Sequence, residues 1–252
     1  MKKLIIGNWK MNPDTKVEAQ RIIAAVKKAV TKLARTSVVL CPPFVYMPLV
    51  AGRGTSSVAL GAQDVAPEAQ GSYTGEVSAN MLRDSGAAYA IIGHSERRAM
   101  GETDESISRK VARALEAGVS PVLCVGEKTH DSEGLYMEEL RLQIRHSLSG
   151  IERKDAHKII VAYEPVWAIG AKEAMTPANI LETTIFIRKT LSDIFGQDKA
   201  LKIPVLYGGS VNFKNAGEIV SLGKVDGLLV GRESINPPGF VELLKVVEAL
   251  SK

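Results

Sequence analysis

The sequence predicts an α/β fold in which residues 1–252 form a single closed (β/α)8 barrel domain of eight parallel strands and eight helices. Apolar runs alternate with helical segments along the whole chain, which is typical of a parallel sheet with crossover helices. The predicted strands are apolar throughout, as in sheets that helices cover on both faces. No linker or change of composition interrupts the alternation, and eight units in about 250 residues match a barrel.

The first half of the chain supplies four strand–helix units. Apolar runs predict strands at 4–10, 37–40, 58–63 and 88–94. Apolar residues at helical spacing, with breakers at the ends, predict helices at 13–30, 45–50, 78–85 and 105–117. Pro42 and Pro43 stop the second strand because proline has no N–H for the ladder. Residues 64–77, which contain the breakers Pro67, Gly71, Ser72 and Gly75, are long for a barrel connection.

The second half of the chain repeats this order. Strands are predicted at 119–125, 159–163, 203–207 and 227–230. Helices are predicted at 134–148, 177–191, 212–220 and 237–250, with Thr176 and Asn212 as N-caps. The alternative is an open, doubly wound sheet. That fold would carry a glycine-rich turn after the first strand, which Gly7-Asn8-Trp9-Lys10 does not supply.

The composition indicates a cytoplasmic globular protein with no nucleic-acid or membrane partner. The net charge is only +4, and no run of five like charges suggests a nucleic-acid surface. No stretch is long and apolar enough for a signal peptide or a membrane span. Cys41 and Cys124 lie in apolar runs, so we expect buried free thiols, as in a reducing compartment. Neither cysteine has a neighbouring Cys or His that would suggest metal ligation.

Polar residues gather where the predicted strands end, and a barrel places its active site at that end. In the sixth strand Ile160, Ala162 and Glu164 share one face, so a carboxylate continues an apolar row. Residues 166–175 follow it as a loop with an apolar tip, which suggests a lid over a base. The polar strand ends are Asn8 and Lys10, Gln63, His94, Glu164, Gly208-Gly209-Ser210 and Gly231.

These residue types suit proton transfer beside a carbonyl on a phosphorylated substrate. Glu164 is the candidate base, and His94 the candidate neutral donor, since a following helix start disfavours imidazolium. Lys10 is a flexible cation suited to a phosphate or a developing oxyanion. Glycines after the seventh and eighth strands can present backbone N–H groups to a phosphate.

Five long motifs resemble those of the triosephosphate isomerase family, in order and over essentially the whole chain. They are Gly7-Asn-Trp-Lys-Met-Asn12, Ile91-Ile-Gly-His-Ser-Glu-Arg-Arg98, Ala162-Tyr-Glu-Pro-Val-Trp-Ala-Ile-Gly170, Tyr207-Gly-Gly-Ser-Val211 and Asp226-Gly-Leu-Leu-Val-Gly231. The resemblance implies interconversion of dihydroxyacetone phosphate and D-glyceraldehyde 3-phosphate through an enediol(ate), in glycolysis and gluconeogenesis, without cofactor or metal.

The resemblance also implies roles for individual residues. Glu164 would move a proton between two carbons, and His94 would move protons between two oxygens. Asn8 and Lys10 would bind substrate and stabilise its charge, with Glu96 supporting this site. The residues implied to lie at the phosphate are Gly170, Ser210, Gly231 and Arg232.

Family members are usually homodimers, and the resemblance implies the same here. Residues 64–77 resemble the loop that reaches into a partner subunit, and Thr74 would lie near the partner's catalytic residues.

The chain departs from the family pattern in two places. Residues 171–175 read Ala-Lys-Glu-Ala-Met where the family has Thr-Gly-Lys-Thr-Ala, so Lys172 replaces a glycine. We expect lid closure to survive with altered opening kinetics. Arg232-Glu233 stands where Gly-Ala is common. We expect the Arg232 side chain to point outward and pair with Glu233, which leaves its backbone N–H for phosphate.

Two other functions stay open at this point. Another phosphate-binding barrel enzyme, acting on an amino-sugar phosphate or indole-glycerol phosphate, shares the phosphate glycines but does not require the pair of His94 and Glu164. A catalytically inactive binding or scaffold protein would not need the complete acid–base set. Substrate turnover separates the three.

Overall fold

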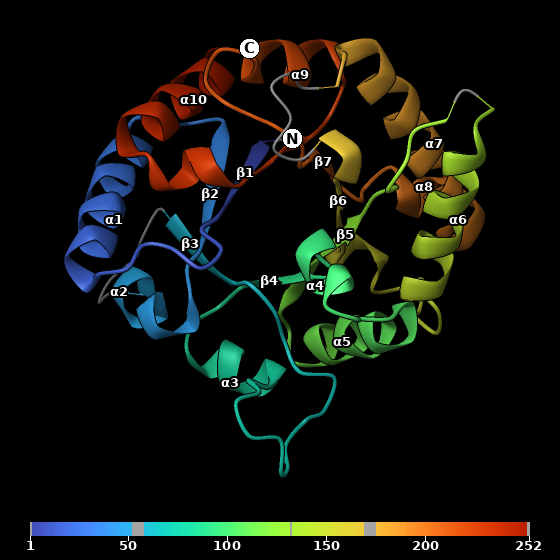
Figure 1. Ribbon diagram of the computed structural model, residues 1–252, viewed down its shortest axis with the longest axis horizontal. Helices are drawn as coiled ribbons and strands as arrows, with labels where there is room; N and C mark the ends of the chain where they lie inside the picture. The colour runs from blue at the N-terminus through green and yellow to red at the C-terminus, as the bar shows by residue number, and fades with distance from the viewer. Residues whose placement is uncertain (1, 52–57, 132, 169–174, 251–252) are drawn as a thin grey trace.

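Eight parallel strands close into a barrel in the computed structural model, which describes residues 2–51, 58–131, 133–168 and 175–250. Each strand pairs with the next, and β1 pairs with β8 to complete the ring (Figure 1). The predicted barrel is therefore confirmed. The strands are β1 (Lys3–Asn8), β2 (Thr36–Cys41), β3 (Val58–Ala62), β4 (Tyr89–Ile92), β5 (Ser120–Val125), β6 (Ile160–Tyr163), β7 (Val205–Tyr207) and β8 (Gly227–Val230).

Helices follow every strand and surround the barrel (Figure 1). The α-helices are α1 (Lys16–Val30), α2 (Met47–Ala51), α3 (Ala79–Asp84), α4 (Ser95–Ala99), α5 (Asp104–Glu116), α6 (Leu135–Ser147), α7 (Pro177–Phe195), α8 (Gln197–Ala200), α9 (Ala216–Leu222) and α10 (Pro237–Leu250). Short 3-10 helices are η1 (Phe44–Tyr46), η2 (Ala156–Lys158), η3 (Val166–Ala168) and η4 (Arg232–Ile235). None of the helices in the described ranges combines the length and apolar character needed to cross a bilayer.

Two predicted helix starts were wrong. The first helix starts at Lys16 because the Thr15 side chain accepts the Glu18 N–H, and Val17 is consequently exposed. The helix expected after Asn212 starts at Ala216. Asn212 donates its N–H to the side chain of Asn215, forming a turn that delays the helix.

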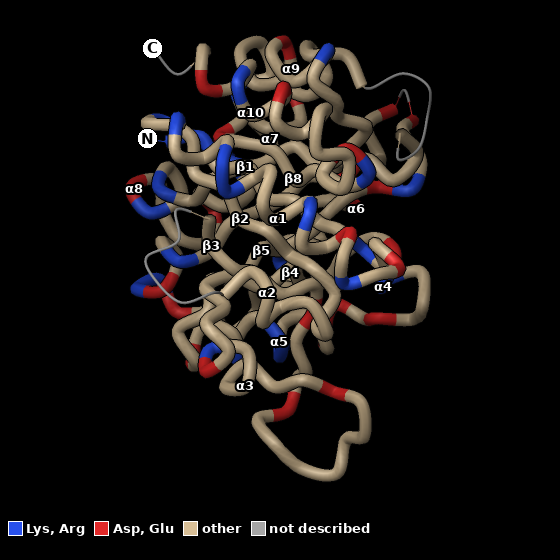
Figure 2. The backbone as a smooth tube through the Cα atoms, turned by 90° about the vertical axis from the view of Figure 1, so that its left-hand side faces the viewer, with Lys and Arg blue, Asp and Glu red and all other residues tan. Residues whose placement is uncertain are grey.

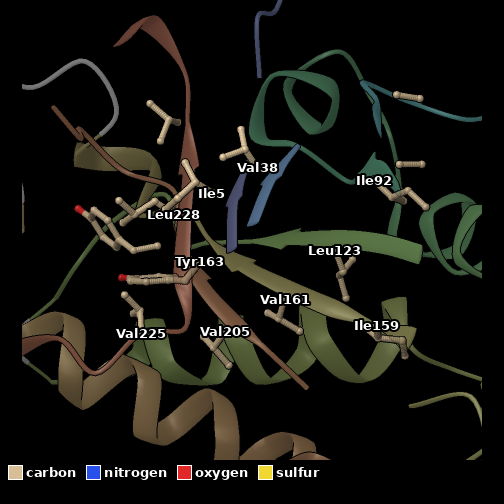
Figure 3. Close-up of a cluster of buried hydrophobic side chains, with 14 of the residues drawn as sticks. Ile5, Val38, Ile92, Leu123, Ile159, Val161, Tyr163, Val205, Val225 and Leu228 are labelled. Atoms are coloured by element: carbon tan, nitrogen blue, oxygen red, sulfur yellow. The ribbon is translucent and has the colours of Figure 1, made fainter. Parts of the chain in front are cut away.

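The strands bury side chains on both faces, and this produces two apolar layers. One layer fills the barrel and includes Ile6, Cys124 and Ala162. The larger layer lies between the strands and the helices and includes Val161 and Val205 (Figure 3). Because alternate residues of β6 enter different layers, the next inward position after Ala162 belongs to Glu164.

The connection between β3 and α3 projects from the body of the barrel as a long loop, seen in both views (Figures 1 and 2). Its base is fixed by a hydrogen bond from the Ala66 N–H to the Val77 carbonyl, 2.9 Å long. The Asp64 carboxylate also accepts from the buried Lys110 ammonium at 2.8 Å and lies 2.8 Å from Arg97 Nε. The loop is therefore attached to α4 and α5 at its base while its tip extends into solvent.

Candidate active site

A cavity of about 620 Å³ opens at the carboxyl ends of the strands. It brings together nearly all of the predicted site residues, although they come from distant parts of the chain. The predicted residues in its lining are Asn8, Lys10, His94, Glu96, Glu164, Ser210, Gly231 and Arg232. Gly170 and residues 171–174 of the expected lid lie outside the described residues, and Thr74 lies in the projecting loop.

Glu164 is buried, its backbone is held by β5, and its carboxylate is held by residues that follow β4. Its N–H donates to the Val125 carbonyl at 2.8 Å, which continues the pairing of β6 with β5. Its carboxylate accepts the Ser95 N–H at 3.3 Å and lies 3.1 Å from His94 Nε2. Burial raises the pKa of Glu164, but His94 and the Ser95 N–H more than offset this and lower it below its ordinary value. The carboxylate is therefore ionised and able to act as a base.

Glycine at position 208 leaves the space that the Glu164 side chain occupies. A Cβ atom at this position would lie 2.9 Å from Glu164 Cγ and 3.5 Å from Oε1. The glycine that sequence reasoning associated with phosphate therefore also allows the candidate base to take its position.

His94 caps the short helix α4 with its own ring. Its Nδ1 accepts the Glu96 N–H at 3.2 Å, so a neutral ring carries its proton on Nε2, which faces Glu164. Burial lowers the pKa of His94, but the Glu164 carboxylate more than offsets this and raises the pKa above its ordinary value. The Glu96 N–H at the helix start favours the neutral His94 ring, as expected from the sequence. The Glu164 carboxylate favours the protonated ring.

Lys10 adopts a left-handed backbone conformation, with φ at 53°, which is uncommon for a residue with a side chain. Its N–H donates to Asn8 Oδ1 at 3.1 Å, and its carbonyl accepts from Gln63 Nε2 at 2.8 Å. The ammonium lies 2.6 Å from Glu96 Oε1. Gln63, which sequence reasoning placed at a strand end without a role, thus helps to hold the Lys10 backbone.

The predicted phosphate side of the cavity is formed by the segments after β7 and β8. Ser210 donates its hydroxyl to the Ala168 carbonyl at 3.2 Å, and its own carbonyl accepts from Asn215 Nδ2 at 3.0 Å. After the neighbouring strand β8, a Cβ on Gly231 would lie 4.0 Å from Lys10 Nζ. A phosphate beside Gly231 would therefore also be close to a cation.

The expected pairing of Arg232 with Glu233 is not formed within the described residues. Glu233 instead accepts from Asn236 Nδ2 at 3.1 Å, since both side chains turn toward the start of α10. Arg232 is exposed and lines the cavity.

Sequence reasoning missed Glu127, which is fully buried just outside the cavity lining. Its Oε1 accepts from the Trp167 indole N–H at 2.7 Å and from the Tyr163 hydroxyl at 2.9 Å. It thereby fixes η3, the near half of the expected lid. The available signal was an acidic residue two positions after the apolar fifth strand.

The described residues contain no cluster of three or more histidine, cysteine or carboxylate side chains suited to hold a metal ion.

Comparisons with known proteins show the family of the chain. A family model described as Triosephosphate isomerase matches residues 3–247. The chain is 43% identical over 249 residues to a triosephosphate isomerase of Dehalococcoides mccartyi, covering 97% of each chain. It is 42% identical over 252 residues to that of Fusobacterium nucleatum, covering 97% of this chain and 99% of the relative. It is 43% identical over 246 residues to that of Thermus thermophilus, covering 96% and 98%.

Proposed function

The chain belongs to the triosephosphate isomerase family, and we propose that the cavity at the strand ends is its active site. The protein is an aldose–ketose isomerase that interconverts dihydroxyacetone phosphate and D-glyceraldehyde 3-phosphate in glycolysis and gluconeogenesis. The observation that carries the site assignment is the contact of His94 Nε2 with Glu164 Oε1, 3.1 Å, inside the cavity.

In the proposed mechanism Glu164 takes a proton from the carbon next to the substrate carbonyl and returns it to the neighbouring carbon. Between the two steps the substrate is an enediolate, whose negative charge needs donors. His94 donates its Nε2 proton to the carbonyl oxygen and takes a proton back from the neighbouring hydroxyl group, which becomes the new carbonyl, so the neutral ring is restored. These roles for the carboxylate and the neutral imidazole are the established ones for the family.

Asn8 at the end of β1 and Lys10 just after it stabilise the enediolate in this scheme. The left-handed backbone of Lys10 is held by hydrogen bonds to its N–H and its carbonyl, so the Lys10 Cα has a fixed position at the cavity wall. Asn8 uses its side-chain oxygen for this support, which leaves its amide nitrogen for substrate. Glu96 contacts Lys10 and supplies the N–H that fixes the His94 ring.

The phosphate is proposed to bind between Ser210 and Gly231, with the backbone N–H of Arg232 beside them. Gly170 completes this set by family resemblance and lies outside the described residues.

We also propose that two copies associate through the projecting loop that carries Thr74. Large apolar side chains are exposed in the connections that follow β1, β2 and β3, which are neighbouring strands, and a partner that covered them would remove apolar surface from water. Met11 is 92% exposed, Val45 78% and Tyr73 49%.

The whole chain is proposed to serve this function as one domain in the cytoplasm. Cys41 and Cys124 are both buried free thiols, which suits a reducing compartment.

The direct test is a coupled assay of dihydroxyacetone phosphate conversion with Glu164→Gln. Removal of a general base costs ~10² to 10⁴ in rate, so kcat should fall by that factor. Glu133→Gln is the matched control, since Glu133 is exposed and outside the cavity lining. Full activity in Glu164→Gln would refute the role given to this carboxylate.

A further inference from the structure

Among the described residues that line the cavity, carboxylates outnumber lysine and arginine side chains, although the proposed substrate is an anion. Among the described lining residues the cations are Lys10 and Arg232, and the carboxylates are Glu96, Glu164 and Glu233. Lys10 is already ion-paired with Glu96 at 2.6 Å, and Glu164 remains ionised. The guanidinium of Arg232 is therefore the lining cation that no described carboxylate pairs with.

Arg232 is held at the rim of the cavity by its place in the chain. It is the first residue of η4 and follows Gly231 at the end of β8. Glu233 cannot neutralise it from this position because its carboxylate is fixed over Gly239 and bonded to Asn236. A Cβ at residue 239 would collide with the Glu233 carboxylate, so glycine there allows this side chain to turn away.

A second cavity of about 500 Å³ adjoins the first and shares Arg232 with it. Its other wall comes from α1 and includes Arg21, which does not line the first cavity. Arg21 also has no ion pair among the described residues. The chain thus offers two unpaired arginines near each other, only one of which faces the active-site cavity.

We propose that the Arg232 guanidinium binds the phosphate group of the substrate and sets specificity for the doubly charged phosphate. This rests on the proposed function. Without Arg232 a dianion would enter a cavity with three carboxylates and one already paired cation. A guanidinium presents two parallel N–H donors to phosphate oxygens and remains charged at every working pH. It supplements the backbone donors after β7 and β8.

The experiment compares Arg232→Gln, Arg232→Lys and Arg21→Gln in the coupled assay, together with inhibition by inorganic phosphate. Arg232→Gln should raise KM and the phosphate inhibition constant about tenfold, as expected for loss of a charge-assisted hydrogen bond. Most of the effect should fall on KM because the bond is present before and during the reaction. Arg232→Lys should lie between wild type and Arg232→Gln, since it keeps the charge and loses the paired donors.

Arg21→Gln is the control that separates a direct contact with the phosphate from a long-range electrostatic effect. It removes one positive charge, as Arg232→Gln does, but from the neighbouring cavity. It should change KM less than twofold. Equal effects in the two glutamine variants, or no effect in either, would overturn the proposal. Circular dichroism melting checks that each variant is folded.

Calorimetric titration of inorganic phosphate into wild type and Arg232→Gln makes the result independent of turnover. If the wild-type protein does not isomerise its substrate, the proposed function fails. Tighter phosphate binding by wild type than by Arg232→Gln would still support the contact, and equal binding would overturn it.

Discussion

At the scale of single residues, the site depends on side chains that fix one another. Glu164, His94 and Glu96 form a chain of contacts in which the Glu96 N–H sets the ring proton and the ring faces the carboxylate. Each member therefore has a defined orientation before substrate arrives. A small displacement of any member should affect the rate more than it affects folding.

Gly208→Ala tests this dependence directly. The new Cβ would lie 2.9 Å from Glu164 Cγ, so the carboxylate must move by several tenths of an ångström. We expect kcat to fall roughly 10²-fold, the size of effect that misplacing a catalytic group produces. The measurement is the coupled assay together with a thermal melt.

Gly217→Ala provides the matched control. It lies in α9, and its Cβ would come no nearer than 3.3 Å to Val246. Activity should stay at the wild-type level, and the melting temperature should not fall, because alanine favours helix. A Gly208→Ala variant as active as this control would show that Glu164 tolerates displacement.

At the scale of elements, the strands and main helices were predictable because each carries a clear period or an uninterrupted apolar run. The short helix α8 is an element that periodicity could not place, as four residues are too few to show it, and α4 was expected only as a helix start after His94. The start of α9 was misjudged because Asn212 and Asn215 form a competing turn.

The site was predictable to a similar extent. Residues at strand ends could be grouped because parallel strands end at one rim of a barrel. Two contacts join segments that are far apart in the sequence, so no local pattern predicts them. Gln63 donates to the Lys10 carbonyl, and Trp167 donates to Glu127. Arg232 and Glu233 were expected to pair as sequence neighbours, but the contacts of Glu233 with α10 decide otherwise.

A carboxylate in α10 links this helix to the turn before β2. Glu248 Oε1 accepts the N–H groups of Ala34 at 2.9 Å and Arg35 at 3.1 Å. Burial raises the pKa of Glu248, but these N–H groups more than offset that and lower it. The ionised carboxylate therefore stabilises the fold above its ordinary pKa, and this contribution is lost as the pH falls through the lowered pKa.

Glu248→Gln should reduce the free energy of unfolding at pH 7 by at most about 1 kcal/mol, since solvent screens the contact. The difference from wild type should shrink as the pH is lowered through the folded-state pKa. Thermal melts of both proteins at pH 7 and at successively lower pH test this. A difference that stays constant down to acid pH would mean that the charge of Glu248 has no part in it.

At the scale of the whole molecule, the projecting loop is the proposed contact between two copies of the chain. The base of the loop is fixed by Asp64 and its ion pairs with Lys110 and Arg97, and the rest of the loop extends away from the barrel (Figure 2). In a dimer formed through this loop, Thr74 of each copy would contact the other subunit.

Thr74→Arg should disrupt that association, because it buries an unpaired charge at the proposed contact. Sedimentation of wild type over a range of concentrations should give about twice the chain mass of 27.1 kDa, and the variant should give a single chain with reduced kcat. Ser149→Arg, an exposed position away from the loop, should remain dimeric. A wild-type protein that sediments as a single chain at every concentration would rule the proposed association out.

The backbone of Lys10 has a consequence for the thermodynamics of binding. Its N–H and carbonyl are both occupied by side chains, from Asn8 and Gln63, while the residue keeps a conformation that few residues adopt. Fixing one residue in a single backbone conformation costs about 1–2 kcal/mol of conformational entropy. Here that entropy is lost when the barrel folds, so it does not weaken the affinity for substrate when the triose phosphate arrives.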